Sequence, residues 1–101
     1  MSEDRIVVNV DADLEDLIPG FLDNRRKDLA SLREALSRGD SKSLQSTGHS
    51  LKGVGGGYGF GGLSEMGAEI ESAAKAGAIE RIAPVIDRLA DYLDRIEVVF
   101  R

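Results

Sequence analysis

Apolar residues recur at steps of three and four along most of the chain, and this spacing constrains the fold more than any other feature. An apolar residue at every third or fourth position gives a helix one continuous apolar face. Two long runs of this kind cover residues 14–36 and 79–100. Gly39 follows the first run in the position of a helix C-cap, and Asp40 or Ser41 is suited to cap the next helix. The sequence therefore predicts two long helices, the second of which continues to the end of its run.

Two shorter helices are expected between these runs. One covers residues 63–74 and is closed by Gly77, and the other covers residues 41–58. Glycine weakens the second of these helices, because each glycine in a helix interior costs about 1 kcal/mol relative to alanine. Propensity alone predicts a loop over residues 53–62. Pro84 lies in the first two turns of the last run, which predicts a late helix start or a mild kink there.

These elements define an all-α fold class. Ile6–Val10 is the one strand-like run, and a single strand cannot build a sheet. Four helices with short connections form an antiparallel up-down four-helix bundle, here with a short extra N-terminal segment or helix. We therefore expect one domain over residues 1–101, a monomer, in which residues 1–12 are an N-terminal extension.

Composition excludes several classes of function. The chain has 101 residues and a net charge of -5, which argues against a general nucleic-acid binder. It has no cysteine and one histidine, which argues against disulfides, thiol chemistry and a zinc or other metal site. No apolar run approaches the roughly 20 residues of a membrane span, and the first ten residues lack the apolar core of a signal peptide. We therefore expect a soluble, cytoplasmic protein that does not bind membranes.

The single histidine, His49, has a distinctive place in the predicted second helix. At about 100° per residue, the apolar side chains of this helix fall within an arc of about 100°, and His49 lies roughly 170° from its centre. The helix therefore directs His49 toward solvent. The residues at helical spacing on the same side are Gln45, Lys52, Gly53 and Gly56.

The segment around His49, residues 41–64, has an unusual composition. It contains no acidic residue although the chain holds 18, and its two lysines give it a charge of +2. Eight of the twelve glycines also lie in it, which favours close approach by another surface. A neutral imidazole is a nucleophile near neutral pH, and a lysine three residues away can balance the charge of a phosphate. These features favour phosphoryl chemistry at His49 over a surface histidine without a role.

The residues His49-Ser50-Leu51-Lys52-Gly53, followed by Gly56, Tyr58 and Gly59, resemble the signature of histidine phosphotransfer (HPt) domains. The pattern of that family is H-x-L-K-G, then small residues and an apolar–Gly pair. The resemblance extends over most of the chain, including Phe21-Leu22 before the signature and Ile70-Glu71 after it.

The resemblance implies roles for individual residues. His49 would be the phosphoacceptor, Lys52 the charge partner of the phosphoryl group, and Gly53 the gap that admits a receiver domain. Glu71 stands where several family members carry a glutamine near the histidine, so its carboxylate is expected within reach of Lys52 or His49. The face that docks the receiver is expected to include Gln45, Gly53, Gly56 and Glu71.

The resemblance also implies partners. The family passes phosphate to and from aspartates of response-regulator receiver domains, and it acts downstream of sensor or hybrid histidine kinases. It has no ATP site and no cofactor of its own, because magnesium and most of the catalytic machinery belong to the receiver. The protein is therefore expected to be a phosphocarrier and not an enzyme.

Other functions remain open from the sequence. A helical interaction module without chemistry would dock through the same glycine-rich face. A hydrolytic enzyme is disfavoured, because His49 has no second catalytic partner. Residues 57–62 match G-x-G-x-x-G, but a dinucleotide site needs a preceding strand where a helix is expected here, so an interhelical turn is favoured.

Overall fold

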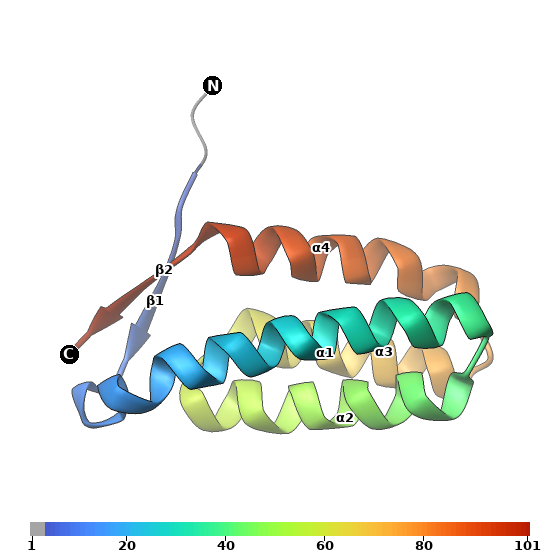
Figure 1. Ribbon diagram of the computed structural model, residues 1–101, viewed down its shortest axis with the longest axis horizontal. Coiled ribbons are helices and arrows are strands. Elements are labelled where there is room, and N and C mark those ends of the chain that lie inside the picture. The colour runs from blue at the N-terminus through green and yellow to red at the C-terminus, as the bar shows by residue number, and fades with distance from the viewer. Residues whose placement is uncertain (1–3) are drawn as a thin grey trace.

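The computed structural model describes residues 4–101, which form four α-helices and a two-stranded sheet (Figure 1). The helices lie side by side, and the strands pair at the end of the bundle where α1 begins and α4 ends (Figure 1). The helices are α1 (Ile18–Arg38), α2 (Ser41–Tyr58), α3 (Gly61–Lys75) and α4 (Ile82–Arg95), and the strands are β1 (Ile6–Val10) and β2 (Ile96–Phe100). Short 3₁₀ helices, Ala12–Leu17 and Ile79–Arg81, precede α1 and α4. In the described part of the chain, none of the helices has the length and apolarity needed to cross a bilayer.

Tight glycine turns join the first three helices. Gly39 ends α1 in the left-handed conformation, with φ 65°, and the Asp40 carboxylate then accepts a hydrogen bond from Ser43 N at 3.1 Å to cap α2. Gly59 ends α2 in the same way, with φ 88°. At the start of α4, Pro84 is the third residue of a helix that begins at Ile82, so the late start expected from this proline is observed.

The apolar faces of the helices meet in one core. Its fully buried side chains come from all four helices, from β1 and from the α2–α3 turn, and include Val10, Leu32, Leu44, Leu51, Phe60, Leu63, Ile70, Ile82, Ile86 and Leu89. The four helices of the expected bundle are therefore present, and their apolar stripes are the surfaces that they bury.

The prediction of a helix over residues 79–100 is wrong at its C-terminal end. Helix α4 ends at Arg95, and Ile96 is extended, with φ -68° and ψ 143°. Strand β2 then pairs in parallel with β1, so that Ile6 lies opposite Ile96 and the ends of the two strands also pair. The inference that the N-terminal run could not build a sheet is therefore also wrong, because its partner lies at the other end of the chain. The β-branched residues Ile96, Val98 and Val99 favour the extended conformation, although Ile96 and Phe100 continue the spacing of the helix.

Residues 1–12 were expected to be an N-terminal extension, but part of this segment belongs to the sheet. Its residues Ile6–Val10 form β1 and Ala12 begins the 3₁₀ helix that follows, and Val10 is only 2% exposed. Residues 1–3 of that segment lie outside the described residues.

Helix α2 continues to Tyr58, so it includes more than half of residues 53–62, where propensity alone predicts a loop. Tertiary packing offsets the cost of its glycines. The ring of Tyr58 stacks on Phe21 of α1 with centroids 4.4 Å apart, and Phe60 stacks on the same ring at 4.9 Å. These aromatic contacts fix the end of α2 against α1.

Helices α2 and α3 touch through their backbones, because glycines face one another across the contact. A Cβ atom at Gly48 would lie 2.9 Å from Gly67 O, and one at Gly67 would lie 2.5 Å from Lys52 N. A Cβ atom at Gly55 would lie 2.6 Å from Ser64 N. Part of the glycine content of α2 is therefore explained by the close approach of α3, a neighbour within the same chain.

Candidate functional site

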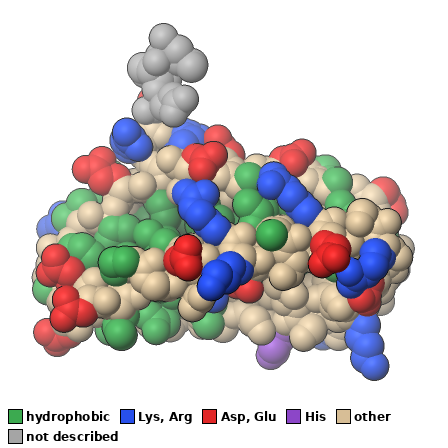
Figure 2. Space-filling model, viewed as in Figure 1, with side chains coloured by type: hydrophobic (Ala, Val, Ile, Leu, Met, Phe, Trp, Pro, Cys, Tyr) green, Lys and Arg blue, Asp and Glu red, His purple; other side chains and the backbone are tan. Residues whose placement is uncertain are grey.

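His49 projects from the middle of α2, on the side away from the buried residues Leu44, Gly48 and Leu51. Its side chain is 72% exposed. Figure 2 shows this histidine, in purple, protruding from the lower edge of the molecule. The helical position predicted from the sequence is thus the position that the structure gives this ring.

Glu71 of α3 contacts the imidazole ring directly. Its carboxylate is only 12% exposed, and its Oε2 lies 3.0 Å from His49 Nδ1. A carboxylate can only accept in this contact, so Nδ1 carries the hydrogen and donates it to Glu71. In the neutral ring, the available lone pair is then on Nε2.

Two lysines approach the same carboxylate. Lys52 Nζ lies 3.9 Å from Glu71 Oε1, and Lys75 Nζ lies 3.6 Å from Glu71 Oε2. Both lysine side chains are more than half exposed. Lys75 was not among the residues expected at the site. Its position four residues after Glu71 on α3 is the sequence signal that places it there.

Burial and the neighbouring charges shift the pKa of Glu71 in opposite directions. Burial raises the pKa of this carboxyl, whereas the hydrogen bond from His49, the positive charges of Lys75 and Lys52, and that of His49 when its ring is protonated lower it. The lowering influences win together, and the pKa lies below the ordinary value of 4.5. Glu71 is therefore a carboxylate at neutral pH and the negative centre of the site.

Two hollows flank Glu71. The first is lined by Glu71, His49 and three residues of α2, which are Lys42, Gln45 and Ser46. The second is lined by Glu71, Lys52, Lys75 and the small residues Ala68, Ser72 and Ala76. Gln45 thus lines the hollow on one side of Glu71, and Lys52 lines the hollow on the other side.

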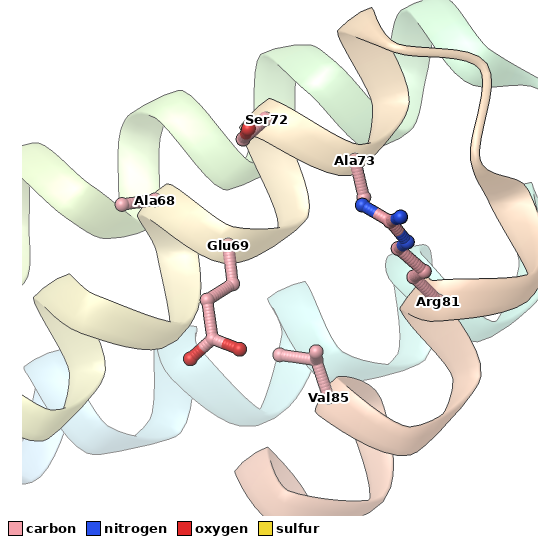
Figure 3. A pocket seen from close by; sticks show the side chains of 6 residues that line it. All are labelled: Ala68, Glu69, Ser72, Ala73, Arg81 and Val85. Atoms are coloured by element: carbon pink, nitrogen blue, oxygen red, sulfur yellow. The ribbon is translucent and has the colours of Figure 1, made fainter.

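A further hollow lies between α3 and α4 (Figure 3). Ala68 and Ser72 line it as well as the hollow beside Lys52, so the two hollows are neighbours across α3. In Figure 3 the carboxylate of Glu69 extends toward Val85 of α4. Arg88 donates two hydrogen bonds to that carboxylate, at 3.0 and 3.2 Å. This hollow contains an ion-paired carboxylate and no histidine.

The remaining glycines of α2 leave an open surface beside His49. A Cβ atom at Gly53 or Gly57 would have no other group within 4 Å, and one at Gly56 would meet only Ser64 Oγ, at 3.8 Å. Ser64 itself donates a hydrogen bond to Lys52 O at 2.9 Å, which ties this part of α2 to α3. One turn beyond the histidine, the helix therefore presents bare backbone to solvent.

The site offers nothing that resembles a metal centre. Within residues 4–101, no three His, Asp or Glu side chains are grouped as ligands for an ion would be. The chemistry available in this part of the chain is that of an exposed imidazole held by one carboxylate and accompanied by two ammonium groups.

The site therefore consists of an exposed histidine on the second of four packed helices, with a carboxylate of the third helix beside it. The family model for the Hpt domain matches residues 16–98, which is most of the chain. The protein therefore belongs to the histidine phosphotransfer (Hpt) domain family, whose members are phosphocarriers of two-component phosphorelays. The family generally interacts with receiver domains and histidine kinases. No curated protein and no solved structure matches the chain.

Proposed function

We propose that His49 accepts a phosphoryl group from the aspartate of a response-regulator receiver domain and can return it. The observation that carries this proposal is the contact between His49 Nδ1 and Glu71 Oε2 at 3.0 Å on an otherwise exposed ring. A carboxylate on Nδ1 fixes the ring and its tautomer, so that Nε2 is the nucleophile.

The transfer needs no separate base, because the attacking nitrogen Nε2 carries no proton. The Nε2 lone pair attacks the phosphorus of the aspartyl phosphate, an N–P bond forms, and the bond from phosphorus to the aspartate oxygen breaks. The leaving group is the aspartate carboxylate, and the proton on Nδ1 stays on the ring. The ring gains positive charge as the N–P bond forms, and the Glu71 carboxylate stabilises that charge. The reverse steps return the phosphoryl group to the receiver.

Lys52 supplies positive charge for the incoming group. It lies one turn from His49 on α2 and its ammonium group already stands at the edge of the site. Magnesium, which phosphoryl transfer to and from aspartate also uses, belongs to the receiver in this proposal. The chain's own contribution is the nucleophile, its orientation and the surrounding charge.

The docking face in this proposal includes Gln45, Gly53, Gly56 and Glu71. The absence of a side chain at Gly53 lets a receiver bring its aspartate close to His49, because an added side chain there would point into open space beside the ring. In-line transfer is sensitive to distance, and a displacement of about 1 Å can cost a hundredfold in rate.

The proposal includes the organisation expected from the sequence. Residues 1–101 form one monomeric domain with antiparallel up-down helices, which works in the cytoplasm with a receiver domain and a sensor or hybrid histidine kinase. The two-residue connections at Gly39-Asp40 and Gly59-Phe60 support the up-down order, because so short a link favours opposite directions in neighbouring helices.

Phosphate transfer from a labelled receiver tests the proposal. A receiver domain carrying ³²P on its aspartate is mixed with the wild-type protein and with His49→Gln. We expect label on the wild type that is labile in acid and stable in base, as a phosphoramidate is, and none on His49→Gln. Label on His49→Gln at the wild-type level would overturn the assignment. A receiver that binds the wild type tightly and leaves no label would instead identify an interaction module without chemistry.

A further inference from the structure

Lys75 is an unassigned cation next to the proposed phosphoacceptor. It is the last residue of α3, and its Nζ lies 3.6 Å from the same Glu71 oxygen that contacts His49 Nδ1 at 3.0 Å. Two contacts through one oxygen atom thus connect the lysine to the imidazole ring. More than half of its side chain is exposed, so a change of rotamer on the solvent side meets little steric hindrance.

Glu71 does not hold either lysine firmly. The separations of 3.6 Å for Lys75 and 3.9 Å for Lys52 exceed those of hydrogen bonds, whereas the His49 contact is within that range. A single carboxylate here faces two ammonium groups. With a neutral imidazole, the cluster of Glu71, Lys52 and Lys75 therefore carries an excess of one positive charge.

A phosphoryl group on His49 would change this balance. It would bring about two negative charges next to the ring, more than a single lysine can neutralise. The carboxylate of Glu71 would then compete with a stronger anion for both lysines. Exposed, weakly held ammonium groups can make that exchange by rotating their side chains, with no change in the backbone.

We propose that Lys75 is a second phosphate-contacting residue, which together with Lys52 leaves Glu71 and binds the phosphoryl group once it is on His49. The contact is an ion pair and forms no covalent bond, so the bonds made and broken during phosphoryl transfer stay the same. This inference rests on the proposed phosphoacceptor role of His49. Glu71 keeps both lysines beside the ring until the phosphate arrives.

The chain provides a matched control for this proposal. Lys27 and Asp23 of α1 form an ion pair with the same four-residue spacing and nearly the same separation, 3.7 Å, as Lys75 and Glu71. Lys27→Gln therefore removes the same charge from a comparable surface pair outside the site. Lys75→Arg keeps the charge and tests whether any cation is sufficient.

Two measurements separate this inference from the proposed function. First, phosphoramidate loads His49 chemically, and the ³¹P resonance of the phosphoryl group is followed against pH. We expect Lys75→Gln to raise the midpoint of that ³¹P titration by about 0.3 to 0.5 pH unit, because a nearby ammonium favours the more negative form. Lys27→Gln should leave the midpoint unchanged, and Lys75→Arg should restore it.

Second, the rate of transfer from a labelled receiver is compared among the same proteins. Lys75→Gln should slow transfer roughly threefold to tenfold relative to Lys27→Gln, with the difference shrinking at high salt. A ³¹P midpoint and a transfer rate for Lys75→Gln that both equal those of Lys27→Gln would overturn the inference. Failure of the proposed function gives a different result, in which phosphoramidate labels the wild type while the phosphorylated receiver does not. In that case the ³¹P titration alone decides whether Lys75 contacts the phosphate.

Discussion

Gly67 of α3 lies directly against Gly48 of α2, since a Cβ atom at residue 67 would stand 2.7 Å from Gly48 O. A Cβ atom at Gly48 would in turn stand 2.8 Å from Glu71 N. His49 follows Gly48 in sequence, and Glu71 lies one turn after Gly67. The backbone contact between two glycines therefore sets the distance between the imidazole and the carboxylate that holds it.

Gly48→Ala should destabilise the protein and disturb the site together. The added methyl group must displace the backbone of α3, and overpacking of this kind costs about 1–3 kcal/mol, partly offset by the better helix propensity of alanine. Urea denaturation measures the free energy of unfolding, and the matched control is Gly57→Ala, where a Cβ atom meets nothing. The control should gain up to about 1 kcal/mol. A Gly48→Ala protein as stable as Gly57→Ala would contradict the packing argument.

Gly53→Gln should separate stability from function. Residue 53 is helical and open, so a side chain there should leave the melting temperature at or above that of the wild type. The same side chain would stand between His49 and an approaching receiver and should slow phosphate transfer by about tenfold or more. The control is Gly20→Gln, at an equally open helical glycine of α1. Equal transfer rates for the two variants with one receiver would show that Gly53 is not the gap through which the receiver approaches.

Glu71→Gln should change how stability depends on pH. The folded protein lowers the pKa of Glu71 below its ordinary value of 4.5, so the fold favours the charged carboxylate. The stabilisation from this lowering is fully present above about pH 4.5 and is lost as the pH falls through the lower folded value. Asp40, whose pKa hydrogen bonds from Ser43 also lower, is present in both proteins and cancels in the comparison.

The measurement is urea denaturation of the wild type and Glu71→Gln from neutral pH to about pH 3. The difference in unfolding free energy should be constant near neutrality and should change in favour of the variant on acidification. A difference that stays the same over the whole range would mean that the charge of Glu71 does not contribute to folding.

Val10→Ala should weaken the fold and leave the phosphoacceptor in place. Val10 is 2% exposed in β1, and loss of its buried methyl groups should cost about 1–3 kcal/mol. Val7 of the same strand is 56% exposed, so Val7→Ala serves as the control and should stay within about 0.5 kcal/mol of the wild type. Phosphate transfer to His49, measured where both proteins are folded, should match the wild type. Slower transfer for folded Val10→Ala would show that the strands influence the site.

The helices could be predicted from the sequence, because each buries one apolar stripe whose spacing is visible locally. The sheet could not. Ile96 and Phe100 continue the spacing of α4, and the evidence for a strand depends on a partner, Ile6–Val10, at the far end of the chain. Pairing between distant segments has no local signal, and an isolated strand-like run gives no reason to look for a second one.

The site was predictable to the extent that one helix determines it. The exposure of His49 and the neighbouring positions of Lys52 and Gly53 follow from helical geometry alone. The glycines were a correct signal of close approach, but the sequence does not say which surface approaches. Gly48 and Gly55 face α3, whereas Gly53 faces open space. Lys75 was missed because its relation to His49 passes through Glu71. Its spacing of four residues from Glu71 indicates a contact with that carboxylate, but only the packing of α3 against α2 brings the contact to His49.

The parallel strands also bear on the order in which the chain folds. The hydrogen bond from Arg101 Nε to Asn9 Oδ1 joins residues 92 positions apart, whereas the glycine turns join helices through two residues. Closing so long a loop in an unfolded chain carries a conformational entropy cost of about 4 kcal/mol. If the bundle is already folded, the cost is smaller, because the helices hold the two ends of the chain near each other. We therefore expect the helical hairpins to form first and the two strands to pair last, so that the contact between Asn9 and Arg101 forms only when the bundle is already folded.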